Sequence, residues 1–159
     1  MSLSNLQAQI QDILFDKGST LIKTYYYLLK SSGGVYSAPD LTAYQAAMKV
    51  RLTYGTATAL WSLSSSGVSP ALSIITTTGA ELEAATGLPI SGLTSIWGVR
   101  LEVADTITAA IDWKPQVRLP LTGLSYDSAV YDIELSASGQ PTFKIIKGRL
   151  FAAEEVTKT

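Results

Sequence analysis

Short stretches of alternating apolar and polar residues, separated by turn-forming residues, are the feature that most limits how this chain can fold. The clearest stretch is SIWGVRLEVAD, in which Trp97, Val99, Leu101 and Val103 share one side of an extended chain. Similar stretches recur along the sequence, with Gly, Ser and Pro residues between them. This spacing predicts an all-β fold, either a sandwich or a barrel.

Several other segments are expected to form strands. Residues 19–30, STLIKTYYYLLK, are apolar on both sides, which predicts a strand covered on both faces. Residues 41–52 fit either a strand or a helix capped by Asp40, and the β-rich surroundings favour the strand. Shorter strands are expected in TATALWSLSSSG and LSIITTTG, and a single helical turn is expected to start at Asp105.

The segment VYDIEL begins a predicted hairpin near the end of the chain. Tyr131, Ile133 and Leu135 should point inward, whereas Asp132 and Glu134 should point outward. These two carboxylates are a weak hint of a calcium site, but no Asp-rich loop accompanies them. The sequence therefore favours solvated strand residues at these positions.

The second strand of this hairpin cannot alternate regularly. Phe143 and Ile145 share one side, but Ile146, Gly148 and Leu150 have the opposite parity. This change predicts a β-bulge near Ile145 and Ile146, with Gly148 allowing an irregular backbone or close packing.

The start of the chain is predicted to be helical. Leu6, Ile10, Ile13 and Leu14 fall on one side of a helix, and Gly18 can end it. A competing interpretation assigns DILF to a strand that leads into the Gly18 turn. We expect an N-terminal helical extension over residues 1–17 and a β-sandwich domain over residues 18–159. The proline-containing stretch KPQVRLPLTGLSYDS, about residues 114–128, is expected to be a long connection or an edge strand.

The composition argues against most classes of active site. There is no histidine and no cysteine, which removes the usual general base, thiol nucleophiles and the commonest metal ligands. The thirteen acidic residues allow a carboxylate pair such as glycosidases use, but solvated strand faces explain them more simply. We therefore expect a non-enzymatic protein with no metal and no cofactor.

The charge pattern also limits the partners. The net charge is −1 and the basic residues are scattered, so no nucleic-acid partner is expected. No signal peptide and no membrane-spanning apolar run are visible. Only 16% of the residues are charged, against about 25% in an average domain. This low share suggests surfaces covered by partner subunits, although Ser/Thr-rich β proteins can have a similar composition without a partner.

The aromatic residues allow two interpretations. Three tryptophans and eight tyrosines could build a sugar-binding platform. Trp97 and Trp61, however, lie among core-type residues and are expected in the core. Trp113, beside Lys114 and Pro115, is expected to be the most exposed of the three.

A series of short motifs resembles small immunoglobulin-like β-sandwich proteins and domains of tailed bacteriophages and prophages, and is similar to the N-terminal domain of upper-baseplate proteins. The motifs are Gly18-Ser19-Thr20, Asp40-Leu41-Thr42 followed by AYQAAMKVR, Ala104-Asp105-Thr106 with Ala109-Ala110, VYDIEL, Gly148-Arg149-Leu150 and Glu155-Val156-Thr157. Their shared order over about residues 18–157 carries the resemblance. The predicted N-terminal helix and the stretch at 114–128 depart from the family pattern.

The resemblance implies an immunoglobulin-like sandwich and a structural role in a virion, assembled in the host cytoplasm. We expect a tail, baseplate or fibre-attachment protein that contacts other virion proteins and copies of itself. One alternative is a capsid-decoration or neck protein, and another is a carbohydrate-binding sandwich that contacts the host surface. The candidate subunit contacts are Leu6, Ile10, Ile13, Trp113, Val117, Leu119 and Leu121.

Overall fold

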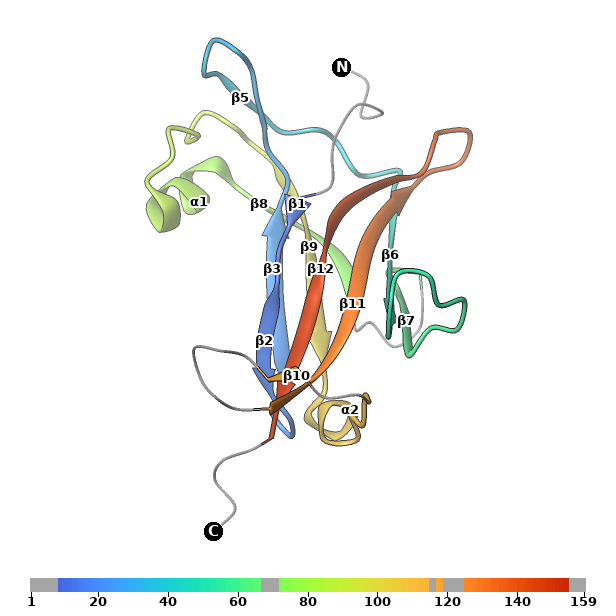
Figure 1. Ribbon diagram of the computed structural model, residues 1–159. Coiled ribbons are helices and arrows are strands. Elements are labelled where there is room, and N and C mark those ends of the chain that lie inside the picture. Colours follow the sequence, from blue (N-terminus) through green and yellow to red (C-terminus); the bar gives the residue numbers. More distant parts are fainter. Residues whose placement is uncertain (1–8, 67–71, 115–116, 119–124, 155–159) are drawn as a thin grey trace.

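The fold is mostly β, as expected. The computed structural model describes residues 9–66, 72–114, 117–118 and 125–154, with only the backbone at 117–118. The larger sheet has the strand order β1-β12-β11-β6-β7, with β2 also paired to β12 and β10 to β11 (Figure 1). Its strands are β1 (Gln9–Ile10), β2 (Ile13–Asp16), β6 (Gln45–Arg51), β7 (Trp61–Ser64), β10 (Val117–Arg118), β11 (Ser125–Ser136) and β12 (Phe143–Ala153).

A smaller sheet lies behind the larger one in Figure 1 and has the order β3-β9-β8. Its strands are β3 (Leu21–Tyr26), β8 (Leu72–Thr77) and β9 (Ile96–Val103). A two-stranded ribbon, β4 (Leu29–Lys30) with β5 (Tyr36–Ser37), extends from one end. The larger and the smaller sheet share one hydrophobic core. The larger sheet contributes Met48 and Ile133 to it, and the smaller sheet contributes Leu72 and Leu101.

Most of the expected strands are present. Residues 41–52 contain β6, in which Ala46, Met48 and Val50 are buried, so the strand interpretation is confirmed. The pattern that starts at Ile96 is confirmed in β9, where every second residue from Val99 to Val103 is buried.

The expectation for β3 was only half right. The segment is a strand, but it is not covered on both faces, because Ile22 and Tyr26 on its outer side are 47% and 37% exposed. The smaller sheet packs against the larger sheet on one face only, so the outer face of β3 lacks the covering layer that a strand of an α/β sheet would have.

The predicted N-terminal helix is wrong over the residues that the structure describes. Gln9–Asp16 forms β1 and β2, which pair in parallel with β12, and the interpretation of DILF as a strand is confirmed. Ile13 and Phe15 are buried whereas Leu14 is 53% exposed, a period of two rather than 3.6. Backbone pairing with β12 therefore overrides a helical spacing of only four apolar residues, and this stretch belongs to the larger sheet.

The bulge in β12 is confirmed. Ile133 of β11 lies opposite Ile146, and the next residue, Glu134, lies opposite Lys144, so Ile145 is the extra residue. Both Ile145 and Ile146 are 5% exposed, which explains why the apolar pattern changes parity at this point.

Gly148 allows close packing rather than an unusual backbone angle. A Cβ atom at this position would lie 2.0 Å from the carbonyl oxygen of Gln11. The same oxygen accepts a hydrogen bond of 2.6 Å from the hydroxyl of Tyr131. A glycine is thus needed where the β1–β2 connection crosses β12.

Two helices complete the described part. The turn expected at Asp105 is confirmed as α2 (Asp105–Ala109). The sequence analysis missed α1 (Gly79–Thr86), which projects to one side in Figure 1. Its signal was present, because Thr78 and Glu81 form a capping box and Gly87, at φ 73°, ends the helix.

Candidate interaction surface

The outer face of the larger sheet is turned toward the viewer in Figure 1. The strand register places a regular array of charged residues on this face. In the middle strand, Asp132 lies opposite Lys49 of β6 on one side and Lys147 of β12 on the other. Both lysines are exposed. One carboxylate therefore lies between two lysines on neighbouring strands.

In the next row of paired residues across the sheet, the residues on both flanking strands are basic. Val130 of β11 lies opposite Arg51 of β6 and opposite Arg149 of β12. The backbone N–H of Arg149 donates a hydrogen bond of 2.9 Å to Oδ1 of Asp12, which fixes the edge of this row.

Asp132 is not exposed, contrary to the sequence-based expectation. It is 4% exposed, and its Oδ2 lies 2.6 Å from Nζ of Lys144. The same Nζ lies 3.6 Å from Oε1 of Glu134. The hydrogen bond to Asp132 is the main cause that raises the pKa of Lys144. Long lysine side chains can cover a neighbouring carboxylate in this way even on an outward face.

We call this surface the charged face and define it by Asp12, Lys49, Arg51, Asp132, Glu134, Lys144, Lys147 and Arg149. It holds five of the twelve basic residues and three acidic ones, so its charge is about +2, whereas the whole chain carries −1. A concentration of positive charge on one face of an acidic protein favours contact with an acidic partner surface.

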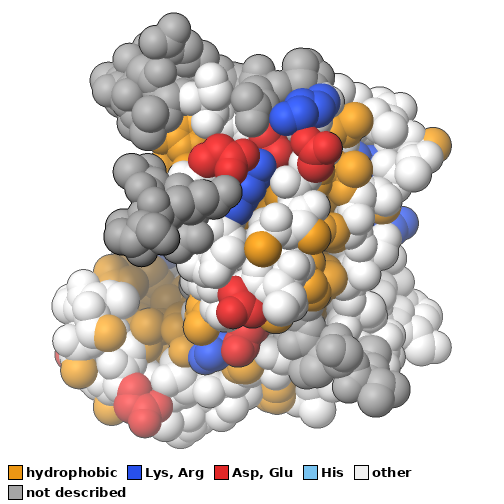
Figure 2. All heavy atoms as spheres, turned by 90° about the horizontal axis from the view of Figure 1, so that it is seen from below, with side chains coloured by type: hydrophobic (Ala, Val, Ile, Leu, Met, Phe, Trp, Pro, Cys, Tyr) orange, Lys and Arg blue, Asp and Glu red, His pale blue; other side chains and the backbone are white. Residues whose placement is uncertain are grey.

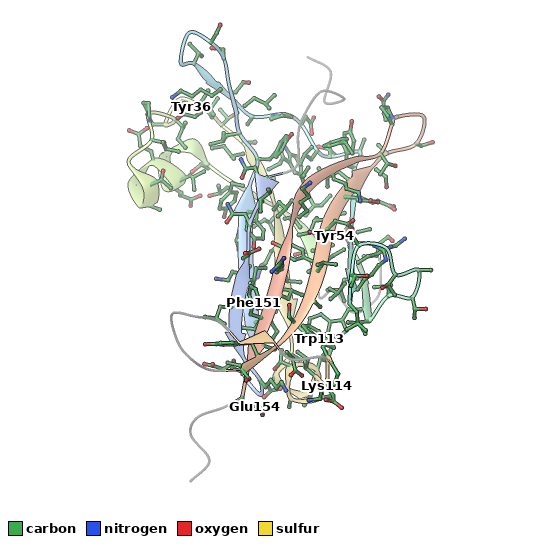
Figure 3. All side chains as sticks on the ribbon, viewed as in Figure 1. Tyr36, Tyr54, Trp113, Lys114, Phe151 and Glu154 are labelled. Atoms are coloured by element: carbon green, nitrogen blue, oxygen red, sulfur yellow. The ribbon has the colours of Figure 1, made fainter. Side chains whose placement is uncertain are left out.

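Exposed apolar side chains border the charged face along β1 and β2. Ile10 is 73% exposed and Leu14 is 53% exposed, and both lie on its side of the sheet. Leu14 pairs with Phe151 of β12, which is only 7% exposed and packs edge-to-face on Tyr126 at 6.4 Å. Figure 3 shows Phe151 on this side of the sheet, near β2.

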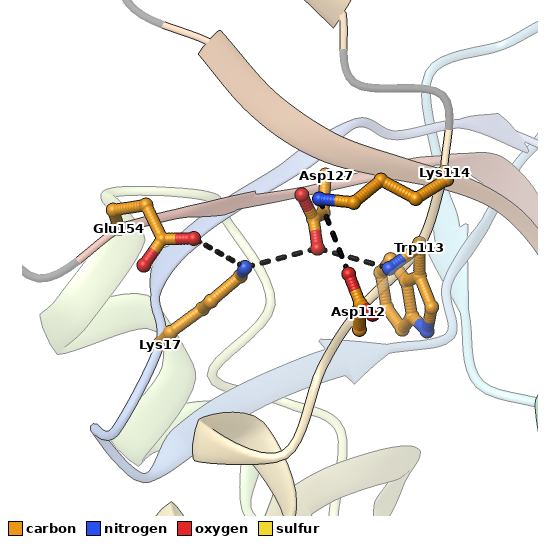
Figure 4. Close-up of polar contacts among 6 residues, drawn as sticks. All are labelled: Lys17, Asp112, Trp113, Lys114, Asp127 and Glu154. Atoms are coloured by element: carbon orange, nitrogen blue, oxygen red, sulfur yellow. Dashed lines mark hydrogen bonds and ion pairs between the residues drawn. The ribbon is translucent and has the colours of Figure 1, made fainter.

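A buried ion pair links separate chain segments at the end of the molecule where β11 begins and β12 ends (Figure 4). Nζ of Lys17 lies 2.9 Å from Oδ2 of Asp127 and 2.7 Å from Oε1 of Glu154. The same Oδ2 accepts a hydrogen bond of 2.9 Å from the backbone N–H of Trp113. Burial lowers the pKa of Lys17, but its bonds to Glu154 and Asp127 outweigh burial and raise it. This arrangement joins four chain segments and keeps the lysine protonated, which suits a structural role.

Viewed from this end, acidic and basic side chains lie next to each other in separate small groups, with hydrophobic side chains between them (Figure 2). Lys114 and Asp112 form an exposed pair at 3.1 Å, which contributes little to stability. Trp113 is 4% exposed, so the expectation that it is the most exposed tryptophan is wrong. Its ring packs edge-to-face on Trp61 at 5.1 Å, which draws it into the core.

The structure divides the sequence-predicted contact residues into three groups. Ile10 is exposed on the surface, whereas the side chains of Ile13 and Trp113 are buried within the chain. Val117 lies in β10, and its side chain is not described. Leu6, Leu119 and Leu121 lie outside the described residues.

The sequence analysis missed the charged face. Its signal was the spacing of Lys49 with Arg51 and of Lys147 with Arg149, which places each pair on one side of a strand. What the sequence alone could not supply is the register that aligns these pairs on either side of β11.

Comparisons with known protein families and with curated proteins found no match. Among the described residues, no group of three or more acidic, histidine or cysteine side chains is arranged to hold a metal ion. No helix in the described part of the chain is long and apolar enough to cross a membrane.

Proposed function

We propose that the chain is a non-enzymatic structural protein of a bacteriophage virion, a tail, baseplate or fibre-attachment component that acts through subunit contacts. The charged face, with exposed Ile10 and Leu14 at its border, is the observation that carries this proposal. A positive face with an apolar margin suits a partner that has an acidic surface and apolar anchor residues.

The strand order supports the finer proposal of an immunoglobulin-like sandwich. In that fold, one sheet contains strands B, E and D, and the other contains G, F, C and C′. The order β3-β9-β8 fits the first sheet, and β12-β11-β6-β7 fits the second when the strands are named in chain order. The first strands, β1 and β2, join the second sheet beside its last strand. This assignment agrees with the order of the short motifs in the sequence.

The proposal is tested in purified phage particles from a strain that encodes this chain. Mass spectrometry of the particles should detect the protein in a constant ratio to the other virion proteins. Its absence from particles would refute the virion role, whatever its fold.

The contact surface is tested by complementation with variants. Ile10→Asp and the double variant Lys147→Glu/Arg149→Glu should each reduce incorporation into particles at least tenfold while the purified protein stays folded. Ile107→Asp, at an isoleucine that is 45% exposed on α2, is the matched control and should be incorporated normally. Normal incorporation of the first two variants would remove this face from the proposal.

A capsid-decoration or neck protein would use the same kind of surface, because a fold does not determine the position in a particle. Labelling the protein in intact particles and locating the label by electron microscopy separates these roles. A label on the tail or baseplate supports the leading proposal, and a label on the head or neck supports the alternative.

A further inference from the structure

A tyrosine-rich pocket lies between the sheets, near the ribbon formed by β4 and β5. It has a volume of about 330 Å³ and a lining that includes Tyr25, Tyr26, Tyr27, Tyr36, Ile145 and Ile146. We call it the tyrosine pocket. Figure 3 shows Tyr36 in the upper part of the molecule, on the ribbon side. A volume of this size is at the lower end of the range for small-molecule sites and suits a single ring.

Two irregular features of the strands shape this pocket. The bulge in β12 places Ile145 and Ile146 next to each other in its wall. Gly98 of β9 forms another part of the wall, where a Cβ atom would lie 2.6 Å from the carbonyl oxygen of Tyr25 and 2.8 Å from the ring of Tyr26. The tyrosines of β3 therefore lie directly against the β9 backbone.

A cation–π contact orders the rim of the tyrosine pocket. Nζ of Lys30 lies 5.3 Å from the centre of the Tyr36 ring, which steadies this ring by a cation–π interaction. Tyr26 is 37% exposed, so its ring is also accessible from solvent. The pocket thus presents aromatic rings that are held in place before a ligand arrives.

The chemistry of the lining indicates an uncharged ligand with hydroxyl groups. The lining itself contains no charged side chain, and the Lys30 ammonium at the rim lies over the Tyr36 ring, so the pocket suits a neutral ligand better than a phosphate or a carboxylate. Gln9, Thr24 and the tyrosines nevertheless supply polar groups, which a purely apolar ligand would leave without partners.

One of these polar groups lacks a partner. The hydroxyl oxygen of Tyr27 is buried and makes no hydrogen bond within the described part of the chain. The hydroxyl of Tyr25, by contrast, is paired with that of Tyr131. A buried hydroxyl without a partner is costly to stability, so Tyr27 is an energetically unfavourable point in the wall of this pocket.

We propose that the tyrosine pocket binds a neutral pyranose ring of a glycan. The apolar face of the sugar packs on the tyrosine rings, and its edge hydroxyls bond to the polar groups of the rim. This proposal goes beyond the structural role, because a contact surface between subunits needs no such pocket.

The test uses saturation-transfer NMR with the methyl glycosides of glucose, galactose, N-acetylglucosamine and rhamnose, together with an array of pyranose-containing glycans. At least one probe should bind the full chain. Tyr36→Ala should weaken that binding tenfold or more, whereas Tyr36→Phe should weaken it less than threefold because the ring remains. Tyr54→Ala, at an exposed tyrosine outside the pocket, should leave it unchanged.

Absence of binding to every glycoside and array glycan would overturn the proposal, and so would binding that Tyr36→Ala leaves intact. If particles incorporate the Tyr36→Ala variant normally, a failure here is distinguished from a failure of the virion role.

Discussion

Gly148→Ala tests whether close packing at the β1–β2 connection holds the first strands in the larger sheet. The new methyl group would lie 2.0 Å from the Gln11 carbonyl oxygen and 2.7 Å from its carbonyl carbon. Both atoms belong to the backbone, so no side-chain rotation relieves the overlap and the connection must move away from β12.

The cost has two parts. Overpacking in a tight core costs about 1–3 kcal/mol. Moving Gln11 also breaks its 2.6 Å hydrogen bond from the Tyr131 hydroxyl, which costs about 1 kcal/mol. The expected loss of stability is about 2–4 kcal/mol, or about 1–2 M in the urea midpoint.

The measurement is urea unfolding followed by tryptophan fluorescence, with Gly92→Ala as the control. A Cβ atom at Gly92 would meet no heavy atom within 4 Å, so this variant should stay within about 0.5 kcal/mol of the parent chain. Tyr131→Phe should destabilise the parent more than it destabilises Gly148→Ala, because the shared hydrogen bond is already broken there. The reasoning is refuted if Gly148→Ala is as stable as Gly92→Ala, or if the two effects simply add.

Three further predictions concern the ion pair, the pH dependence and α1. Lys17→Met removes the 2.9 Å ion pair between Lys17 and the fully buried Asp127 and should cost about 2–4 kcal/mol in urea unfolding, whereas Lys114→Met should cost almost nothing. Burial raises the pKa of Tyr27 to about 12, so the stability that depends on its neutral hydroxyl is complete below pH 10 and is lost as the pH rises toward 12. Tyr27→Phe should flatten this alkaline loss of stability in a pH series of thermal melts. An unchanged slope would contradict the prediction. Thr78→Ala removes the N-cap of α1 and should cost about 1 kcal/mol, with loss of amide protection confined to that helix in hydrogen exchange.

The sequence was sufficient to predict the structure where the local pattern of apolar and polar residues determined it. The change of parity at Ile145 and Ile146 predicted the bulge, because the apolar residues that face the core from a regular strand all keep the same parity. The strand at 41–52 and the turn at Asp105 could likewise be predicted from local pattern and surroundings.

The sequence was insufficient where distant segments determined the outcome. The stretch before Gly18 has helical spacing, and only the free edge of β12, more than a hundred residues away, makes it a strand. Trp113 looked exposed beside a lysine and a proline, yet its contact with Trp61 of β7 buries it. Asp132 looked solvated until the register placed lysines on both sides of it. The same dependence on register hid the charged face.

The parallel pairing of β2 with β12 also determines when the first strands can fold during synthesis of the chain. The hydrogen bond between Asp12 and Arg149 spans 137 residues, so it cannot form until almost all of the described chain has left the ribosome. At the usual rate of synthesis this delay is about 10–30 s. Throughout it, Ile13 and Phe15, which are buried in the finished fold, have no strand to pair with. A neighbouring nascent chain that already exposes its own β12 could capture them first, so crowded translation of this protein should favour exchange of the first strands between copies.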